Sequence, residues 1–124
     1  MNLLLITLGG GIGALLRYLS SKMMHSCFQI VFPIGTIFVN CLGSLIIGLL
    51  FGIFEKYTVP TGLKLFLITG FLGGYTTFSA YSIETAAFLI NGEIKAALLN
   101  IVISNVLCLV FALTGIYLSR FLVK

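Results

Sequence analysis

Acidic residues are almost missing from this sequence. Aspartate does not occur, and glutamate occurs only at Glu55, Glu84 and Glu93. Charged residues of both signs make up 8% of the chain and hydrophobic residues 60%, whereas a soluble domain is roughly one quarter charged and half apolar. The composition therefore excludes an ordinary soluble domain and indicates a protein that lies in a membrane.

The shortage of reactive side chains argues against an enzyme. The chain has one histidine, His25, and three cysteines, Cys27, Cys41 and Cys108. Together with three glutamates they do not assemble into a nucleophile–base pair, a metal cluster or a phosphate loop. The cysteine spacing indicates neither a metal site nor a disulfide framework. His25 lies in a polar stretch and is assigned no role.

Basic residues are scattered and give a net charge of +4. Most lie at the ends of apolar segments, where lysine and arginine reach the membrane interface. This pattern does not indicate nucleic-acid binding. The first basic residue is Arg17, so the beginning of the chain is not typical of a signal peptide.

The apolar segments predict an all-α membrane protein with one domain over residues 1–124. A helix that spans a bilayer needs about 20 residues, so the chain has room for four such helices and short loops. The expected helices cover about residues 3–19, 34–54, 62–90 and 94–122, with a polar connection over 20–33. Because four helices make a thin bundle, we expect self-association.

The third segment contains residues that do not favour a smooth membrane helix. Residues 70–82 read GFLGGYTTFSAYS, with glycines followed by hydroxyl residues. In lipid, backbone that leaves the helix must find other partners or line a polar space. We therefore expect a break at 73–77 and a site beside it; the alternative is a glycine-rich packing surface.

Polar residues recur every four positions in the second and fourth segments. Thr36, Asn40 and Ser44 share one helical face, and Ser104 and Cys108 continue a similar stripe that begins at residue 100. A buried asparagine amide needs a partner. For Asn40 this is either an interhelical hydrogen bond or a passing anion.

Three further features lie in or beside apolar segments. Gly9 and Gly13 stand one helical turn apart and let another helix approach closely. Arg17 is either an interfacial anchor or a fixed positive charge at the mouth of an anion path. Glu84 is expected to make a structural hydrogen bond.

The distribution of basic residues leaves the membrane orientation open. Four lie on the side of the N-terminus and three on the opposite side, namely Lys56, Lys64, Arg120 and Lys124 against Arg17, Lys22 and Lys95. This bias is too small to fix a topology. Two copies inserted in opposite orientations would form an inverted-repeat dimer, an arrangement that larger transporters build within one chain.

Three motifs resemble those of a known family. Residues 10–18 (GGIGALLRY), 35–43 (GTIFVNCLG) and 70–82 are similar, in the same order, to the GGxxGAxxRY, GTxxVN and GxxGGxTTFSxF motifs of the Fluc (CrcB) fluoride channels. The similarity covers essentially the whole chain.

The resemblance implies a small passive channel that exports fluoride across the bacterial inner membrane. Its fold would be four transmembrane helices per subunit with a broken third helix, in an antiparallel dual-topology homodimer with two pores. A structural sodium ion would be held at the dimer centre by the backbone carbonyls of Gly73 and Thr76 of each subunit. Fluoride and membrane lipid would be the other partners.

The resemblance also assigns residues to the fluoride path. The two pore aromatics fall on Phe78 and Tyr81, and Arg17 falls in the vestibule. Amide and hydroxyl donors can replace the water that fluoride loses, and ring edges carry partial positive charge. The remaining pore-lining positions are Asn40, Thr36, Ser79, Ser104 and Cys108.

The chain departs from the family pattern at three positions. Tyr81 stands where phenylalanine is usual, and Cys108 and Ala112 stand where hydroxyl residues are expected. The resemblance therefore leaves open a heterodimer with a paralogous chain and unequal pores. The nearly even distribution of basic residues favours the homodimer.

Two other classes of membrane protein are weaker alternatives. A small multidrug exporter is also a four-helix dual-topology dimer, but it needs a carboxylate inside an early helix, and the first acidic residue here is Glu55. A non-transporting assembly subunit would explain the packing glycines but not the clustered hydroxyls and aromatics after residue 75.

Overall fold

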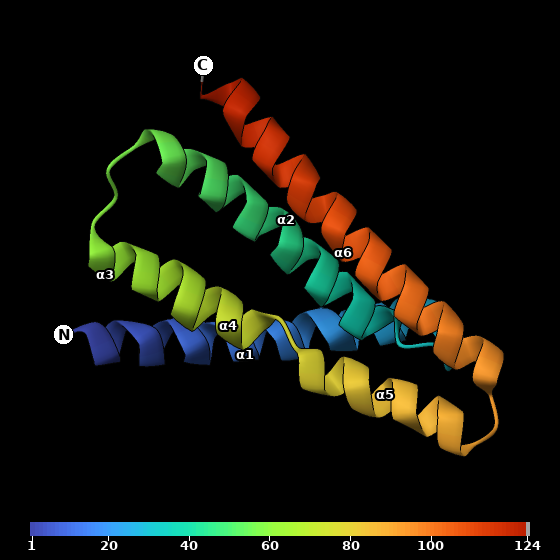
Figure 1. The fold of residues 1–124 in the computed structure, drawn as a ribbon. Helices are drawn as coiled ribbons and strands as arrows, with labels where there is room; N and C mark the ends of the chain where they lie inside the picture. Colours follow the sequence, from blue (N-terminus) through green and yellow to red (C-terminus); the bar gives the residue numbers. More distant parts are fainter. Residues whose placement is uncertain (124) are drawn as a thin grey trace.

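The computed structural model describes residues 1–123. Lys124, one of the four basic residues counted above, lies outside the described residues. Regular structure in the described part is entirely helical (Figure 1), with the elements α1 (Asn2–Phe28), α2 (Ile34–Lys56), α3 (Thr61–Lys64), η1 (Leu65–Leu72), α4 (Gly73–Tyr75), α5 (Phe78–Ile90) and α6 (Ile94–Leu122). Three of these, α1, α2 and α6, are long and apolar enough to cross a membrane.

Helix α1 is longer than the sequence predicts. We expected it to end near residue 19, followed by a polar connection over 20–33, and that prediction is wrong because α1 continues to Phe28. Residues 20–28 are more polar than the segment before them, but they contain neither glycine nor proline and so do not interrupt the helix. The helix ends at Gln29, whose backbone is left-handed at φ 45° and whose N–H bonds His25 O.

Helices α2 and α6 pack along each other (Figure 1). Glycines bring their backbones into direct contact, because a Cβ atom at Gly48 would overlap the Ala112 carbonyl and one at Gly115 would overlap the Leu45 carbonyl. Near the C-terminal ends of the two helices, Arg120 and Glu55 form an exposed ion pair with an N–O distance of 2.8 Å. An exposed pair adds little stability, so close packing holds the two helices together.

The second close contact joins α1 to η1 and α4. Gly9 and Gly13 are both buried, and a Cβ atom at Gly9 would lie 2.6 Å from Phe66 O and 2.9 Å from Phe71 N. A Cβ atom at Gly70 would in turn lie 2.8 Å from Ile6 O. The close helix approach predicted from Gly9 and Gly13 is thereby confirmed.

The third apolar segment is divided between α4 and α5 (Figure 1). Thr76 (φ −86°, ψ 158°) and Thr77 (φ −150°, ψ 113°) are extended. Gly73–Tyr75 is helical, so the prediction that the break begins at residue 73 is wrong. Glycine lowers helix stability but does not prevent a helix from forming. In this segment the backbone leaves the helical conformation only at Thr76 and Thr77, where other hydrogen-bond partners are present.

Candidate functional site

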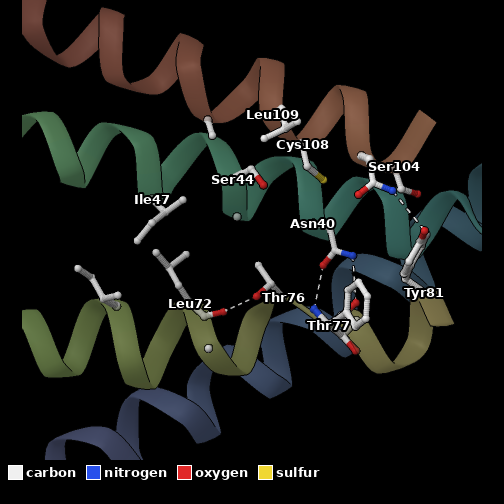
Figure 2. Close-up of a pocket in the computed structure, with 16 residues that line it drawn as sticks. Asn40, Ser44, Ile47, Leu72, Thr76, Thr77, Tyr81, Ser104, Cys108 and Leu109 are labelled. Atoms are coloured by element: carbon white, nitrogen blue, oxygen red, sulfur yellow. Dashed lines mark hydrogen bonds between the residues drawn. The ribbon is translucent and has the colours of Figure 1, made fainter. Parts of the chain in front are cut away.

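Asn40 holds the interruption between α4 and α5. Its Oδ1 accepts a hydrogen bond from Thr77 N at 2.8 Å, and its Nδ2 donates to Thr77 O at 3.0 Å. The side-chain amide therefore pairs with Thr77 as a neighbouring strand would (Figure 2). This is the interhelical hydrogen bond considered above for Asn40. The second hydrogen on Nδ2 is not needed for the pairing.

The interruption also removes the helical donors of the four carbonyl groups of residues 73–76. In a continuous helix, Thr77 N would bond Gly73 O and Ala80 N would bond Thr76 O. Instead, Thr77 N bonds Asn40 and Ala80 N bonds the Thr77 side-chain oxygen at 3.2 Å, which caps α5. The two carbonyls that lose these helical donors are those predicted to hold sodium.

A cavity of about 570 Å³ lies beside this interruption, between α2, η1, α4, α5 and α6. We call it the break cavity (Figure 2). It brings together most of the predicted site residues, namely Asn40, Gly73, Thr76, Phe78, Tyr81, Ser104 and Cys108. Its other lining residues are mostly apolar, and none of the lining residues is a lysine, arginine, histidine, aspartate or glutamate.

The two aromatic rings of the site lie against each other. The ring centres of Phe78 and Tyr81 are 5.2 Å apart and the rings are tilted by 45°. Phe78 is 76% exposed in the single chain. Because the rings are tilted, the pair presents both ring edges and ring faces to the cavity that they line.

Asn105, which the sequence interpretation left without a role, fixes the direction of the Tyr81 hydroxyl. Its Nδ2 donates to Ile101 O at 2.7 Å and lies 3.2 Å from Tyr81 Oη. Because a carbonyl only accepts, the NH₂ group must face Ile101, and the tyrosine oxygen then accepts the other N–H. The Tyr81 hydroxyl proton is left to point elsewhere. The requirement that a membrane asparagine find a partner was the signal available in the sequence.

The polar stripe of α6 is largely paired within the chain. Ser104 Oγ donates to Asn100 Oδ1 at 3.2 Å, and Asn100 Nδ2 donates to Thr85 Oγ1 at 2.9 Å. Thr85 in turn donates to Tyr81 O at 2.8 Å. All three side chains are buried. This relay ties α6 to α5, so Ser104 has a structural contact in addition to its position in the break cavity.

A second cavity, of about 680 Å³, lies between α1, α2 and α5. We call it the charged cavity because Arg17, His25 and Glu84 line it. Thr36 and Ser79 also lie here and not in the break cavity. Thr36 lies on α2 and Ser79 on α5, so the residues predicted to line the pore are divided between the two cavities of the single chain. Thr77 lines both cavities.

Glu84 makes the structural hydrogen bond expected of it. Thr36 Oγ1 donates to Glu84 Oε1 at 2.6 Å, which joins α2 to α5. The other oxygen, Oε2, is buried and has no hydrogen-bond partner among the described residues. Glu84 therefore contributes a carboxyl group to a cavity that also contains Arg17 and His25.

Comparison with known proteins identifies the family. A family model described as "CrcB-like protein, Camphor Resistance (CrcB)" matches residues 4–116. The chain belongs to the CrcB family.

Curated CrcB relatives match almost the whole chain. A protein of Flavobacterium psychrophilum is 45% identical over 116 residues, covering 93% of this chain and 94% of its own. A Coxiella burnetii protein is 44% identical over 123 residues (97% and 98%), and one of Parabacteroides distasonis is 38% identical over 120 residues (97% and 94%). Each is named "Fluoride-specific ion channel FluC". Ion channels are not enzymes, which agrees with the exclusion made from the sequence.

Proposed function

We propose that this chain forms a passive, fluoride-selective channel that lets fluoride leave the cytoplasm. Its CrcB relatives, named as fluoride-specific channels, support the ion. The observation that carries the proposal is the Asn40–Thr77 pairing, which opens the backbone beside a cavity that contains donors but no charged side chain.

Fluoride must lose tightly bound water to pass a narrow site, and that loss is costly unless other donors replace it. The break cavity offers the second Asn40 N–H, the free Tyr81 O–H and the ring edges of Phe78. These donors are neutral, so they stabilise the anion without binding it so strongly that it cannot leave. Ser104 and Cys108 lie farther along the same cavity wall on α6.

We propose that a sodium ion sits at the interruption and that Gly73 and Thr76 supply its oxygen ligands. The freed carbonyls fit this ion, because hard cations take oxygen ligands and both residues have lost their helical donors. When bound, sodium would add positive potential near the path of the anion. The proposal takes two carbonyl ligands from each chain, whereas a hard cation takes several oxygen ligands.

That shortage supports an antiparallel dimer in which a second copy completes the ion site. Each subunit would cross the bacterial inner membrane four times, with α3, η1, α4 and α5 together making the third crossing. Arg17, in the charged cavity, would raise the concentration of anions at the mouth of each pore. A heterodimer with a paralogue would use the same contacts with unequal pores.

The decisive experiment uses this chain as the only protein in liposomes loaded with potassium fluoride or potassium chloride. After addition of valinomycin, an ion-selective electrode records the anion that leaves. We expect rapid fluoride release and chloride release at the rate of empty liposomes. Equal rates for the two anions would reject selectivity. Absence of fluoride release from correctly folded protein, restored by adding a paralogue, would favour the heterodimer.

A further inference from the structure

Two thiols face each other where α2 and α6 meet the break cavity. Cys41 Sγ and Cys108 Sγ are 3.9 Å apart, and neither cysteine is in a disulfide. Cys41 is 7% exposed and is not among the residues that line the cavity. Cys108 lines the cavity, and Figure 2 places its sulfur between α6 and α2, near Asn40. The pair is therefore reachable from the cavity through Cys108.

The spacing of the sulfurs suits a shared metal ion better than a disulfide. Two metal–sulfur bonds of about 2.3 Å at a tetrahedral angle separate the sulfurs by about 3.8 Å. A disulfide requires the sulfurs to close to about 2.05 Å. Helices α2 and α6 are already in backbone contact at Gly48 and Gly115, so they have little room to approach further.

We propose that Cys41 and Cys108 form a binding site for a thiophilic divalent cation of the zinc or cadmium class, and that the bound ion obstructs the break cavity. Each thiol loses one proton to the surrounding water as its sulfur binds the metal. The two thiolates then balance the charge of the ion, so no net charge is buried. The coordination positions that remain face the cavity, where water can fill them.

The predicted slowing of fluoride flow rests on the proposed channel function. The binding of the metal ion by the two cysteines does not. An ion held by Cys108 narrows the cavity that Asn40, Phe78 and Tyr81 also line. Fluoride passing through the cavity would be slowed. The cation would then act as an inhibitor whose effect depends on this pair of cysteines.

The first arm of the test measures binding to the full-length protein in detergent. Cadmium is the probe, followed by thiolate-to-metal charge-transfer absorption and by equilibrium dialysis. We expect saturable binding in the unmodified protein and in C27S, since Cys27 is exposed and lines neither cavity. C41S and C108S should lose it. Binding should release protons and weaken as the pH falls.

The second arm measures fluoride release from liposomes with and without cadmium. We expect cadmium to slow release by about tenfold or more in the unmodified protein and in C27S, with recovery after a chelator is added. The double variant C41S/C108S should resist. Equal inhibition of that variant, or equal binding to it, would overturn the proposal.

Inhibition that requires the oxidant diamide, and that only a reductant reverses, would overturn the metal-site proposal. It would show that the two cysteines form a disulfide instead. If the protein binds cadmium through the pair but releases no fluoride, the metal site stands and the proposed channel function fails.

Discussion

The break cavity and the charged cavity share Thr77 but have opposite character. The break cavity is lined by apolar side chains, amides and hydroxyls, whereas Arg17, His25 and Glu84 all line the charged cavity. Full charges act at a distance and gather hydrated ions, while neutral donors act only at contact and can replace lost water. The difference teaches that one short chain can keep charged and neutral polar groups in separate cavities; in the proposed channel, the first would gather the anion and the second would replace its water.

The largest expected effect comes from changing the residue that shapes the break cavity. Asn40→Asp removes the N–H that bonds Thr77 O and places a negative charge beside the proposed path. A buried carbonyl left unpaired costs about 1–3 kcal/mol, and repulsion of the anion adds to this. We expect fluoride release from liposomes to fall about 100-fold or more.

Asn91→Asp is the matched control for this change, because Asn91 lies in an exposed turn. It should behave like the unmodified chain. Size-exclusion chromatography and circular dichroism establish that both variants fold. Normal release through folded Asn40→Asp would contradict the role given to the amide.

Phe78→Ile tests whether a ring edge takes part in the neutral path. The side chain is 76% exposed in the single chain, so its loss should leave the fold of each subunit intact. We expect release to slow by about tenfold or more, because an aliphatic side chain has no comparable positive edge. Phe51→Ile, at an exposed position of α2 that lines neither cavity, should release fluoride normally. An unchanged rate for Phe78→Ile would remove the ring from the path.

Arg17→Gln tests the charged cavity in isolation. If Arg17 acts by attraction at a distance, its loss should slow release about threefold in low salt and much less in high salt, where charges are screened. Lys22→Gln changes an exposed charge on the same helix outside both cavities and should have a smaller effect. A salt-independent loss would instead indicate direct contact between Arg17 and the ion.

The smallest expected effect concerns the hydroxyl that Asn105 directs. Tyr81→Phe removes one donor and should slow release about twofold, as a weak neutral hydrogen bond would. Asn105→Ala should have a similar effect in the unmodified chain and none in the Tyr81→Phe background. Additive effects of the two changes would show that Asn105 acts independently of the hydroxyl.

Sequence periodicity predicts this fold well where apolar runs are long. The sequence predicts a helix over 94–122, and α6 covers Ile94–Leu122. The prediction fails at the end of α1. Polar residues there indicate contact with solvent or with the membrane interface, but polar residues do not by themselves end a helix. The prediction also places the interruption too early, since Gly73 and Gly74 remain helical and the backbone changes only where Asn40 offers hydrogen bonds to Thr77.

The candidate site is predicted less completely than the helices. Motif resemblance brings Asn40, Phe78 and Tyr81 to one cavity, which the structure also does. It does not separate Thr36 on α2 and Ser79 on α5 from them, because the cavity that a side chain lines depends on how the helices pack against one another. The pairing of Asn105 with Tyr81 and of Cys41 with Cys108 depends on the contact between different helices, and periodicity within one helix carries no information on it.

The order of Asn40 and Thr77 along the chain has a consequence for biogenesis. Asn40 precedes Thr77 by 37 residues, so α2 is synthesised before the peptide group that it must satisfy. A nascent chain is made from its N-terminus. The backbone N–H and C=O groups of Thr77 can therefore bond the Asn40 side chain as they enter the bilayer. The irregular backbone then does not have to lie in hydrocarbon with these groups unpaired.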